Sequence, residues 1–392
     1  MPRTEPTRGN IKVCVFGSGT FGTALGSVIA RNGFTVTILC RRPEVASTIN
    51  TEHRNPTHLS ECKLPPLLSA TTSPEEALKG VSFIVHSVPV QASEDFLRPL
   101  KDLIRADVPF ISSSKGIHSE TLETMAELVP RVLQRPQVMA FLSGPTFAKE
   151  LMDEIPSAAV VAAEDPAIAE SCSNLFHCTV FKTYTTTDVI GVEVGGALKN
   201  VYALAAGTLE GMGLGFNTAA FLVTRACVEM NMLALAMGAR PHTMVGLAGI
   251  GDLMLTCLGG ASRNKAVGAR IGQGESLSSV LHSRQQSLAG VAEGVATAPA
   301  ALRLAQKHKV PVHIIEAVAS VIDGSSGPRE AVLNLMQRPK GEDFACHVMH
   351  AAEKQLERSV SPLGVPAKYW AFLAVGQACF ITAFGIWSFR RR

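Results

Sequence analysis

Short apolar runs recur along the first half of the chain, and most of them are followed by a stretch with helical spacing. Several runs are continuous rather than alternating, as strands covered on both faces are. Strands that alternate with helices are typical of βαβ units, so the pattern predicts a doubly wound parallel sheet. The predicted strands occupy residues 11–17, 34–40, 81–88, 108–114, 137–144, 157–163 and 178–184.

The pattern changes after Asp188. Strand-like runs end there, and long helical segments rich in small residues continue to about Arg338, among them "VYALAAGTLEGMG" and "PAALRLAQKHK". The predicted fold class is therefore α/β, with a sheet domain followed by an all-helical domain. The predicted divisions are a disordered lead-in at 1–10, a sheet domain at 11–188, a helical domain at 189–340, a tail and linker at 341–367, and a C-terminal segment at 368–392.

Composition restricts the class of protein. With 392 residues, 46% apolar and 18% charged, the chain is long enough for two domains and is not of the disordered class. A net charge of +3 without a basic, aromatic-interleaved stripe argues against a nucleic-acid partner. The nine cysteines form no CxxC pair and no metal-ligand spacing, so we predict no metal site and interpret them as core residues of a reducing compartment.

The stretch "FGSGTFGTA" follows the first predicted strand and opens a helix, and its three glycines have the GxGxxG spacing. In this context the first glycine forms the tight turn, the second lets the backbone approach a pyrophosphate, and the third permits close helix–strand packing. The helix N-terminus supplies the anion site. The motif predicts a Rossmann-type domain that binds NAD or NADP at Gly17, Gly19, Thr20, Phe21 and Gly22.

The second predicted strand ends in "ILCRRPE". Arg41 and Arg42 occupy the position at which NAD-specific proteins tend to carry an acid, and an arginine there can accommodate a 2′-phosphate. We therefore expect the chain to use NADPH and also to accept NADH. The alternative is that both arginines belong to a solvated turn.

The run "GVEVGGALKNVYALAAG", residues 191–207, is apolar and rich in glycine, yet it carries Lys199 near its middle, with Glu193 before it and Asn200 after it. A lysine is rarely buried unless it is paired, and burial lowers its pKa because it penalises the ammonium. A lysine with a pKa near the working pH suits general acid–base catalysis. Lys199 is therefore a candidate acid–base residue.

Four further stretches join polar groups to glycine or proline turns: "SSSKGI", "SGPTFAKE", "GLAGIGDLMLTC" and "SRNKAVG". Together with the glycine turn, the Lys199 run and "VAEGV", they occur along the chain in the order glycine turn, SKG, GPTFA, GVEVGGALKN, GDL, SRN and VAEGV. With this order, from about Val13 to about Arg338, the chain resembles the glycerol-3-phosphate dehydrogenases that use NAD(P). The resemblance implies that the protein interconverts sn-glycerol 3-phosphate and dihydroxyacetone phosphate. Both are small phosphorylated molecules, and the first would supply glycerolipid synthesis. Reducing that ketone requires a proton for the developing alkoxide, and Lys199 matches the proton donor/acceptor of the family.

The resemblance also implies roles for other residues. Lys115 and Asp252 would join Lys199 as catalytic residues, Lys115 by contacting substrate and cofactor and Asp252 by balancing the ammonium charge. Ser262 is expected to open a helix whose N-terminus binds the substrate phosphate. The implied substrate-binding residues are Lys115, Gly144, Thr146, Lys199, Asn200, Asp252, Thr256, Ser262, Arg263 and Asn264. The implied cofactor contacts beyond the glycine turn are Arg41, Lys115, Ala148, Arg263, Val291 and Glu293.

Taken singly, these residues have plain structural interpretations: Lys115 as a surface lysine, Asp252 and Ser262 as helix caps, and Arg263 as a solvated side chain. Two other functions are also open. A β-hydroxyacid or 6-phosphogluconate type dehydrogenase has a similar domain plan but does not explain "SGPTFA" together with "SRN". A non-enzymatic, membrane-tethered nucleotide sensor would be expected to have lost its acid–base groups first, and here they are present.

Residues 369–389 carry no charge and lie between Lys368 and Arg390, with Trp370 and Trp387 near the two ends. A helix of about 20 residues spans the ~30 Å hydrocarbon core of a bilayer, and tryptophans favour its interfaces. We expect a C-terminal transmembrane helix that tethers cytoplasmic catalytic domains to an intracellular membrane. The alternative is a helix packed on the core or in a dimer interface; a homodimer is expected in either case.

Overall fold

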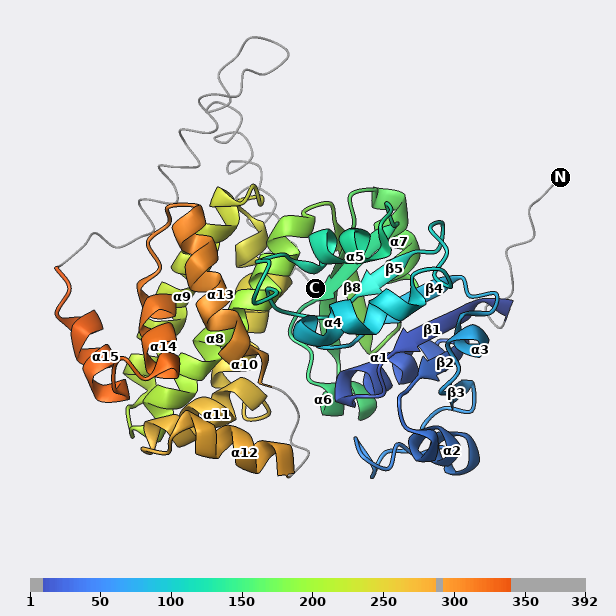
Figure 1. The fold of residues 1–392 in the computed structure, drawn as a ribbon, viewed down its shortest axis with the longest axis horizontal. Coiled ribbons are helices and arrows are strands. Elements are labelled where there is room, and N and C mark those ends of the chain that lie inside the picture. The colour runs from blue at the N-terminus through green and yellow to red at the C-terminus, as the bar shows by residue number, and fades with distance from the viewer. Residues whose placement is uncertain (1–9, 287–291, 340–392) are drawn as a thin grey trace, which may run out of the picture. The chain divides into compact units, whose positions relative to one another are not determined.

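Eight strands form a single sheet with helices on both of its faces (Figure 1). The structure is a computed structural model that describes residues 10–286 and 292–339. The strands are β1 (Lys12–Phe16), β2 (Thr35–Leu39), β3 (Leu68–Thr71), β4 (Phe83–His86), β5 (Phe110–Ser112), β6 (Met139–Ser143), β7 (Ser157–Ala162) and β8 (Phe181–Thr186). Their order across the sheet is β3-β2-β1-β4-β5-β6-β7-β8.

The first six strands in this order run parallel and have the doubly wound arrangement that the sequence predicts. The strand order reverses between β1 and β4, and in open α/β sheets ligands bind at the carboxyl ends of the strands at that switch point. The turn after β1 carries Gly17 and Gly19, with Gly22 following in the first turn of α1, and the turn after β4 begins at Ser87, so both turns lie at this edge.

Two details of the predicted sheet are wrong. β7 runs antiparallel to β6, and β8 follows β7 in parallel, so the last two strands oppose the other six. The only helix between β6 and β7 is α6 (Ala148–Met152), which at 1.5 Å per residue is about 7 Å long and cannot carry the chain back across the sheet. The edge strand β3 was not predicted, because its sequence "LSAT" has no apolar run and it is defined by pairing with β2.

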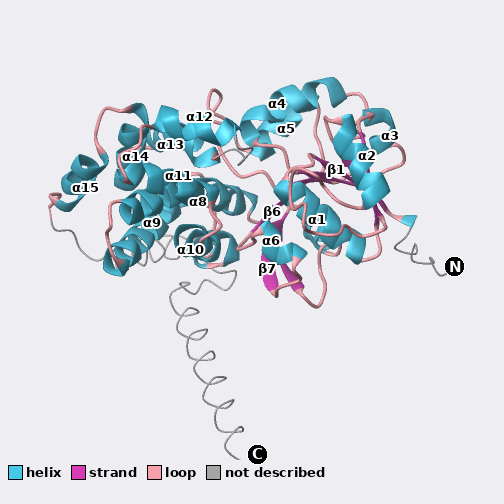
Figure 2. Cartoon of the chain, turned by 90° about the horizontal axis from the view of Figure 1, so that it is seen from below, coloured by secondary structure: helices cyan, strands magenta, loops and turns pink. Residues whose placement is uncertain are grey.

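The helices before β8 belong to the sheet part, and those after it form the helical part. Those of the sheet part are α1 (Thr20–Arg31), α2 (Pro43–Glu52), α3 (Pro74–Leu78), α4 (Val90–Leu97), α5 (Met125–Leu133), α6 and α7 (Pro166–Ser173). Those of the helical part are α8 (Val189–Gly211), α9 (Phe216–Ala236), α10 (Asp252–Leu258), α11 (Arg263–Gly272), α12 (Leu277–Gln286), α13 (Glu293–Lys307), α14 (His313–Asp323) and α15 (Pro328–Met336). Both parts belong to one compact unit that ends at Gln337, and Figure 2 shows the strands confined to the first part.

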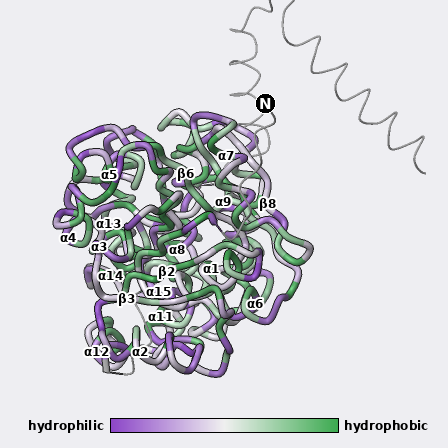
Figure 3. The backbone as a smooth tube through the Cα atoms, turned by 90° about the vertical axis from the view of Figure 1, so that its right-hand side faces the viewer, coloured by the Kyte–Doolittle hydropathy of each residue, from purple (hydrophilic) through white to green (hydrophobic). Residues whose placement is uncertain are grey.

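Successive strand residues point to opposite faces of the sheet, and the core is divided accordingly. Val13 and Val15 pack beneath α1, whereas Cys14 and Phe16 pack on the other face with α4 and α5. A third buried cluster surrounds Tyr202 of α8 and fills the helical part. In Figure 3 many of the hydrophilic residues follow the outer turns of the chain, as expected for cores enclosed between layers.

The long helix α8 is the centre of the helical part, and its glycines permit backbone contact with α11. A Cβ on Gly207 or Gly211 would overlap the carbonyls of Lys265 and Ala269. α8 and α9 have the length and hydropathy of membrane spans, but 78% of the apolar window of α8 is buried in the protein, as in the core helix of a globular domain. The proposed transmembrane segment at residues 369–389 lies outside the described residues.

Candidate functional site

Two lysines and one carboxylate from distant parts of the chain meet beside the sheet. Asp252, the first residue of α10, is fully buried. Its Oδ1 accepts a hydrogen bond from Lys199 Nζ of α8, and its Oδ2 lies 2.6 Å from Lys115 Nζ, in the turn after β5. An unpaired buried carboxylate would be costly, so the two ammonium groups stabilise the burial of this charge. The cluster contains all three residues predicted as catalytic.

The environment of Lys199 draws its pKa down to about 7. Burial is the largest cause, because it penalises the ammonium, and the neighbouring charge of Lys115 acts in the same direction, while Asp252 opposes both. At Asp252 burial favours the neutral acid, but the two lysines outweigh it and hold the pKa below its usual value. Asp252 is therefore ionised at neutral pH, and Lys199 loses its proton far more readily than an ordinary lysine.

The position of Asp252 is set by contacts with α8 and β6. The π-helical turn Leu247–Gly251 precedes it, and a Cβ on Gly195 of α8 would lie 2.5 Å from the Ala248 carbonyl, so only glycine lets this turn approach the helix. Thr256 Oγ1 donates to the Asp252 carbonyl at 2.6 Å and lies 3.4 Å from Oδ1. Ser143 Oγ donates to Oδ2 at 3.5 Å. The surroundings of Lys199 are thus glycine-rich because neighbouring backbones contact α8.

Lys115 connects this cluster to the glycine turn and to the turn after β6. Its Nζ donates to the Gly144 carbonyl at 3.4 Å and lies 6.0 Å from the centre of the Phe21 ring. Gly144 has φ +149°, and a Cβ there would lie 2.8 Å from Ala159 Cα. Thr146, which is buried, donates to the same carbonyl at 3.2 Å. Lys115 is therefore not the ordinary surface lysine of the plain structural interpretation.

The start of α11 adjoins the cluster on its other side. Ser262 caps the helix by accepting from the Lys265 N–H at 3.2 Å, and Arg263 in the first turn is exposed. Asn264 Nδ2 donates to Asn200 Oδ1 at 2.9 Å, and its own Oδ1 accepts from the Gly294 N–H at 2.9 Å. Asn264 therefore ties α11 to α8, next to Lys199, and to the start of α13.

Glu293, the first residue of α13, faces the Lys115 turn: a Cβ on Gly116 would lie 3.2 Å from Glu293 Oε2. Burial raises its pKa to about 7, against the positive charges of Arg263, Lys115 and Lys199. This carboxyl group thus belongs to the same electrostatic cluster. Val291, the other predicted residue of this segment, lies outside the described residues.

The glycine turn has the geometry expected of a dinucleotide site. Gly17 has φ +98°, which favours glycine, and a Cβ on Gly22 would overlap the Gly17 carbonyl. Apart from Gly19 itself and its two chain neighbours, no atom of the described residues lies within 4 Å of the position that a Cβ of Gly19 would take, so this backbone is open to a ligand. Ala148, at the start of α6, is partly buried. The open turn, followed by the N-terminus of α1, fits a pyrophosphate.

The two arginines after β2 have different surroundings. Arg42 Nη2 donates to Thr57 Oγ1 at 2.9 Å, and Nε lies 3.8 Å from Glu44. Arg41 is exposed, and it makes no hydrogen bond or ion pair with other residues in the described part of the chain. Of the two side chains, that of Arg41 is therefore the more available to bind a phosphate group of a ligand.

Glu193 fastens α8 to the sheet part six positions before Lys199. Its carboxylate accepts from Thr124 Oγ1 at 2.8 Å and from the Ala126 N–H at 3.1 Å, so it caps the start of α5 from another helix. Burial raises its pKa to about 8, although the two hydrogen bonds oppose this. Glu193 therefore links α8, the helix that carries Lys199, to α5 of the sheet part.

Sequence reasoning missed several residues that support the site. Ser143 touches Asp252, and Asn55 and His58 contact the glycine turn from the loop after α2. No local motif marks these residues, because each of their partners lies at least 37 positions away along the chain. Across residues 10–286 and 292–339, no three His, Cys, Asp or Glu side chains are grouped as metal ligands.

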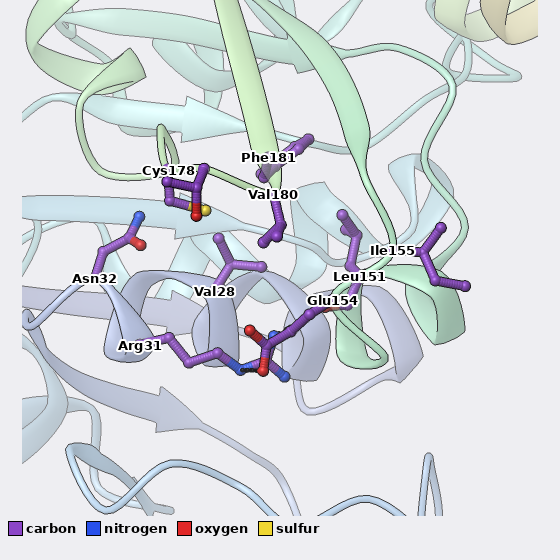
Figure 4. Close-up of a pocket in the computed structure, with 10 residues that line it drawn as sticks. Val28, Arg31, Asn32, Leu151, Glu154, Ile155, Cys178, Val180 and Phe181 are labelled. Atoms are coloured by element: carbon purple, nitrogen blue, oxygen red, sulfur yellow. Dashed lines mark hydrogen bonds and ion pairs between the residues drawn. The ribbon is translucent and has the colours of Figure 1, made fainter.

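A separate cavity of about 210 Å³ lies between the end of α1, α6 and β8 (Figure 4). Arg31 and Glu154 face each other at 3.8 Å along its lining, which also contains Val28, Leu151 and Phe181. The Arg31 guanidinium already donates to the carbonyls of Leu151 and Met152, both at 2.9 Å. None of the predicted site residues lines this cavity.

Comparisons with known proteins agree with this geometry over most of the chain. A family model described as NAD-dependent glycerol-3-phosphate dehydrogenase N-terminus matches residues 12–169. A second, described as NAD-dependent glycerol-3-phosphate dehydrogenase C-terminus, matches residues 188–333. The first model covers β1 to β7 with the glycine turn and Lys115, and the second covers Lys199, Asp252 and the start of α11.

Relatives of similar length carry names of the same kind. The chain is 44% identical over 344 residues to glycerol-3-phosphate dehydrogenase [NAD(+)] 2, chloroplastic, of Arabidopsis thaliana, covering 87% of this chain and 81% of that one. It is 42% identical to the glycerol-3-phosphate dehydrogenase [NAD(P)+] of Leptospira biflexa, covering 84% and 98%. The crystal structure of glycerol-3-phosphate dehydrogenase from Coxiella burnetii superposes with a TM-score of 0.79 at 31% identity, covering 84% of this chain and 99% of that one.

Proposed function

The chain belongs to the NAD-dependent glycerol-3-phosphate dehydrogenase family, and from this premise we propose how its own residues carry out the reaction. The protein is an oxidoreductase that interconverts sn-glycerol 3-phosphate and dihydroxyacetone phosphate with NAD or NADP. We propose that the reaction takes place at the cluster of Lys199, Asp252 and Lys115. The observation that carries the proposal is a buried lysine with a pKa of about 7, paired to a buried carboxylate.

Lys199 is proposed as the proton donor for ketone reduction and the acceptor for alcohol oxidation. During reduction, the ammonium Nζ gives its proton to the carbonyl oxygen of dihydroxyacetone phosphate as the carbonyl carbon receives a hydride. The neutral amine then recovers a proton from water. A pKa near neutrality lets Lys199 act as the donor in reduction and as the acceptor in oxidation, because both the ammonium and the amine form are populated near pH 7.

Asp252 and Lys115 support this proton transfer. Asp252 holds both ammonium groups from one buried position, so Lys199 stays oriented when its charge changes. Lys115, which contacts the Gly144 carbonyl and the Phe21 ring, is proposed to bind substrate and to border the cofactor. Gly144, Thr146, Asn200 and Thr256 line the same region and are proposed substrate contacts.

We propose that the substrate phosphate binds at the start of α11. The first N–H groups of a helix have no intrahelical acceptor, and the helix dipole favours an anion there. Ser262 and Asn264 define this turn, and the exposed Arg263 offers a guanidinium suited to phosphate oxygens. The charge of Arg263 also acts on Glu293 and on His58, which is consistent with a position between substrate and cofactor.

The cofactor is proposed to bind along the carboxyl edge of the sheet. The open backbone at Gly19 and the N-terminus of α1 fit its pyrophosphate, with Gly17 in the turn before the helix and Thr20, Phe21 and Gly22 in its first turn. When bound, its nicotinamide supplies the hydride for reduction and accepts it for oxidation. Ala148 is proposed to contact the nicotinamide side, and Glu293 and Val291 are proposed as further cofactor contacts. Arg41 is proposed to contact a 2′-phosphate, which favours NADPH over NADH.

Substrate choice tests the proposal directly. Purified protein should oxidise NADH or NADPH with dihydroxyacetone phosphate and react very poorly with unphosphorylated dihydroxyacetone, because the latter lacks the anion that α11 would hold. A panel of oxo acids tests the β-hydroxyacid alternative in the same assay. Equal rates with both forms of dihydroxyacetone would contradict the phosphate site, and a preference for an oxo acid would contradict the reaction.

We further propose that residues 369–389 anchor the protein in a membrane, on the strength of the uncharged stretch bounded by Lys368 and Arg390. After cell fractionation and an alkaline carbonate wash, the full-length protein should stay with the membranes. A form truncated after Ala367 should be released. Release of both forms, or retention of both, would contradict the anchor.

A homodimer is also proposed, from apolar side chains exposed at the beginning of α9. Phe216 is 92% exposed and Phe221 is 55% exposed, and such patches favour protein contacts. The truncated protein should sediment as a dimer, and replacing both phenylalanines with serine should give monomers. A truncated protein that sediments as a monomer at micromolar concentration would contradict the proposal.

A further inference from the structure

Asn55 lies in the loop after α2 and contacts the glycine turn, although it would not itself touch the reacting groups. Its side chain is fully buried, and both ends of its amide are used. The Nδ2 group donates to the Ser18 carbonyl and to Thr23 Oγ1, each at 2.9 Å. The Oδ1 atom accepts from the N–H groups of Thr57 and His58, both at 3.1 Å, and from Thr57 Oγ1 at 3.0 Å.

The bond to the Ser18 carbonyl has a consequence for the next residue. In a planar trans peptide the C=O and the following N–H point in opposite directions. Because Asn55 draws the Ser18 oxygen toward the buried loop, the Gly19 N–H of the same peptide points away from that loop. Gly19 is the residue before α1 and faces open space, so its N–H is directed to the side on which a ligand can approach.

The other end of the amide organises the adenosine side of the same turn. The Thr57 hydroxyl that donates to Asn55 also accepts from Arg42 Nη2 at 2.9 Å. The next residue, His58, is hydrogen-bonded through Nδ1 to Thr20 Oγ1 at 3.3 Å. A single buried amide thus connects the end of β2, the loop after α2 and the first turn of α1.

We propose that Asn55 is a positioning residue for cofactor binding, which orients the Ser18–Gly19 peptide toward the pyrophosphate and holds the loop 53–62 over the glycine turn. The inference rests on the proposed placement of the cofactor at this turn. Preorganised backbone donors cost little to order when the ligand binds, so their loss weakens affinity. Since the pyrophosphate is common to NADH and NADPH, both should be affected alike.

Three variants and one control test the proposal, with the Kd for NADH and for NADPH measured by fluorescence titration. Asn55→Ala should raise both Kd values by about 10–100-fold, since a lost buried hydrogen bond costs about 1–3 kcal/mol. Asn55→Asp keeps the three accepting bonds but replaces the donor by a carboxylate oxygen that faces the Ser18 carbonyl. It should therefore raise both Kd values at least as much if Asn55→Ala does not fold. For both variants, kcat at saturating cofactor and KM for dihydroxyacetone phosphate should stay unchanged.

Asn50 provides the matched control. Its amide makes the same kind of double contact, to the N–H and carbonyl of Ala70, both at 2.8 Å, but on the side of α2 that faces β3. Asn50→Ala should lower the Tm and leave both Kd values unchanged. Gly19→Ala separates the inference from its premise, because the added methyl group would enter the open space where the pyrophosphate is proposed.

The outcomes distinguish the two claims. A higher Kd for Gly19→Ala and for the Asn55 variants, with Asn50→Ala normal, supports the proposal. A higher Kd for Gly19→Ala with normal Kd values in the folded Asn55 variants overturns the role of Asn55 and leaves the cofactor placement intact. A normal Kd for Gly19→Ala contradicts the placement itself. Equal weakening by Asn50→Ala and Asn55→Ala would mean general loosening of α2, and it also overturns the proposal.

Discussion

The glycine turn and the Asp252 cluster lie at the same edge of the sheet, but neutral groups hold the first in place and buried charged groups form the second. The hydrogen bonds that the loop after α2 makes to the glycine turn and the start of α1 come from neutral groups, the Asn55 amide and His58. Burial and the nearby arginines lower the pKa of His58, so it is neutral at pH 7. Around Asp252, two ammonium groups share one buried carboxylate.

The difference separates binding from chemistry. Neutral, preorganised backbone groups can hold an anionic cofactor without taking up a proton. A cluster of buried charges has strongly perturbed pKa values, so it can give or take a proton near neutral pH. We therefore expect changes at the cluster to alter the chemical step and its pH dependence, and changes at the glycine turn to alter affinity.

The largest effect should come from Lys199→Ala. Removing the proposed proton donor should lower kcat by about 10²–10⁴-fold, the usual contribution of a positioned acid–base group, with the Kd for NADH unchanged. Lys182→Ala, at an exposed position of β8, is the control and should behave like the wild type. Steady-state kinetics at pH 7 provide the test, and a near-normal kcat would remove Lys199 from the donor role.

Arg263→Ala should act on substrate affinity rather than on the chemical step. The KM for dihydroxyacetone phosphate should rise by roughly 10–10³-fold, because hydrogen bonds to charged groups contribute about 1.5–3 kcal/mol and orientation is lost as well. Arg270 of the same helix pairs with Glu275, so Arg270→Ala controls for loss of charge on α11. If both variants raise the KM equally, the phosphate is not held by Arg263.

The pH dependence should have opposite signs in the two directions. Reduction requires the Lys199 ammonium, so kcat for ketone reduction should fall as pH rises through about 7, by up to about tenfold per pH unit. Oxidation requires the neutral amine, so its kcat should rise over the same interval. Profiles of the same sign in both directions would contradict the assignment.

Glu293 complicates these profiles, because its pKa is also raised to about 7. The variant Glu293→Gln isolates the contribution of Lys199. It should retain opposite slopes in the two directions, with the midpoint moved to lower pH, since a carboxylate that favours the ammonium has been removed. Loss of the pH dependence in this variant would assign the titration to Glu293 instead.

The smallest effect is expected at the end of β2. Arg41→Gln should weaken NADPH by about 3–10-fold more than NADH, because a bond from an exposed arginine to phosphate is partly screened by solvent. Arg42→Gln should change the two cofactors more evenly, since Arg42 is bound to Thr57. Kd values for both cofactors provide the measurement, and equal losses in Arg41→Gln would show that it does not contact the 2′-phosphate.

The sequence predicted those features that depend on neighbouring residues. Apolar runs marked seven of the eight strands in the described residues, and several of these runs are continuous because the strands are buried on both faces. The GxGxxG spacing marked the turn after β1, and Ser262 was recognised as the start of a helix, where it caps α11. β3 was missed and β7 was assigned the wrong direction, because edge pairing and strand direction depend on the chain path outside the strand.

The sequence by itself determined the chemistry available: a lysine within an apolar, glycine-rich helix, and a glycine turn before α1. Only the tertiary structure decided which groups meet. Lys115 and Asp252 are 137 positions apart, Lys199 and Asp252 are 53 apart, and Asn55 and Ser18 are 37 apart. The glycines of α8 indicate that something packs closely against the helix, but a missing side chain does not specify its neighbour. That choice is made when the helices and the sheet pack together and bury one carboxylate between two lysines.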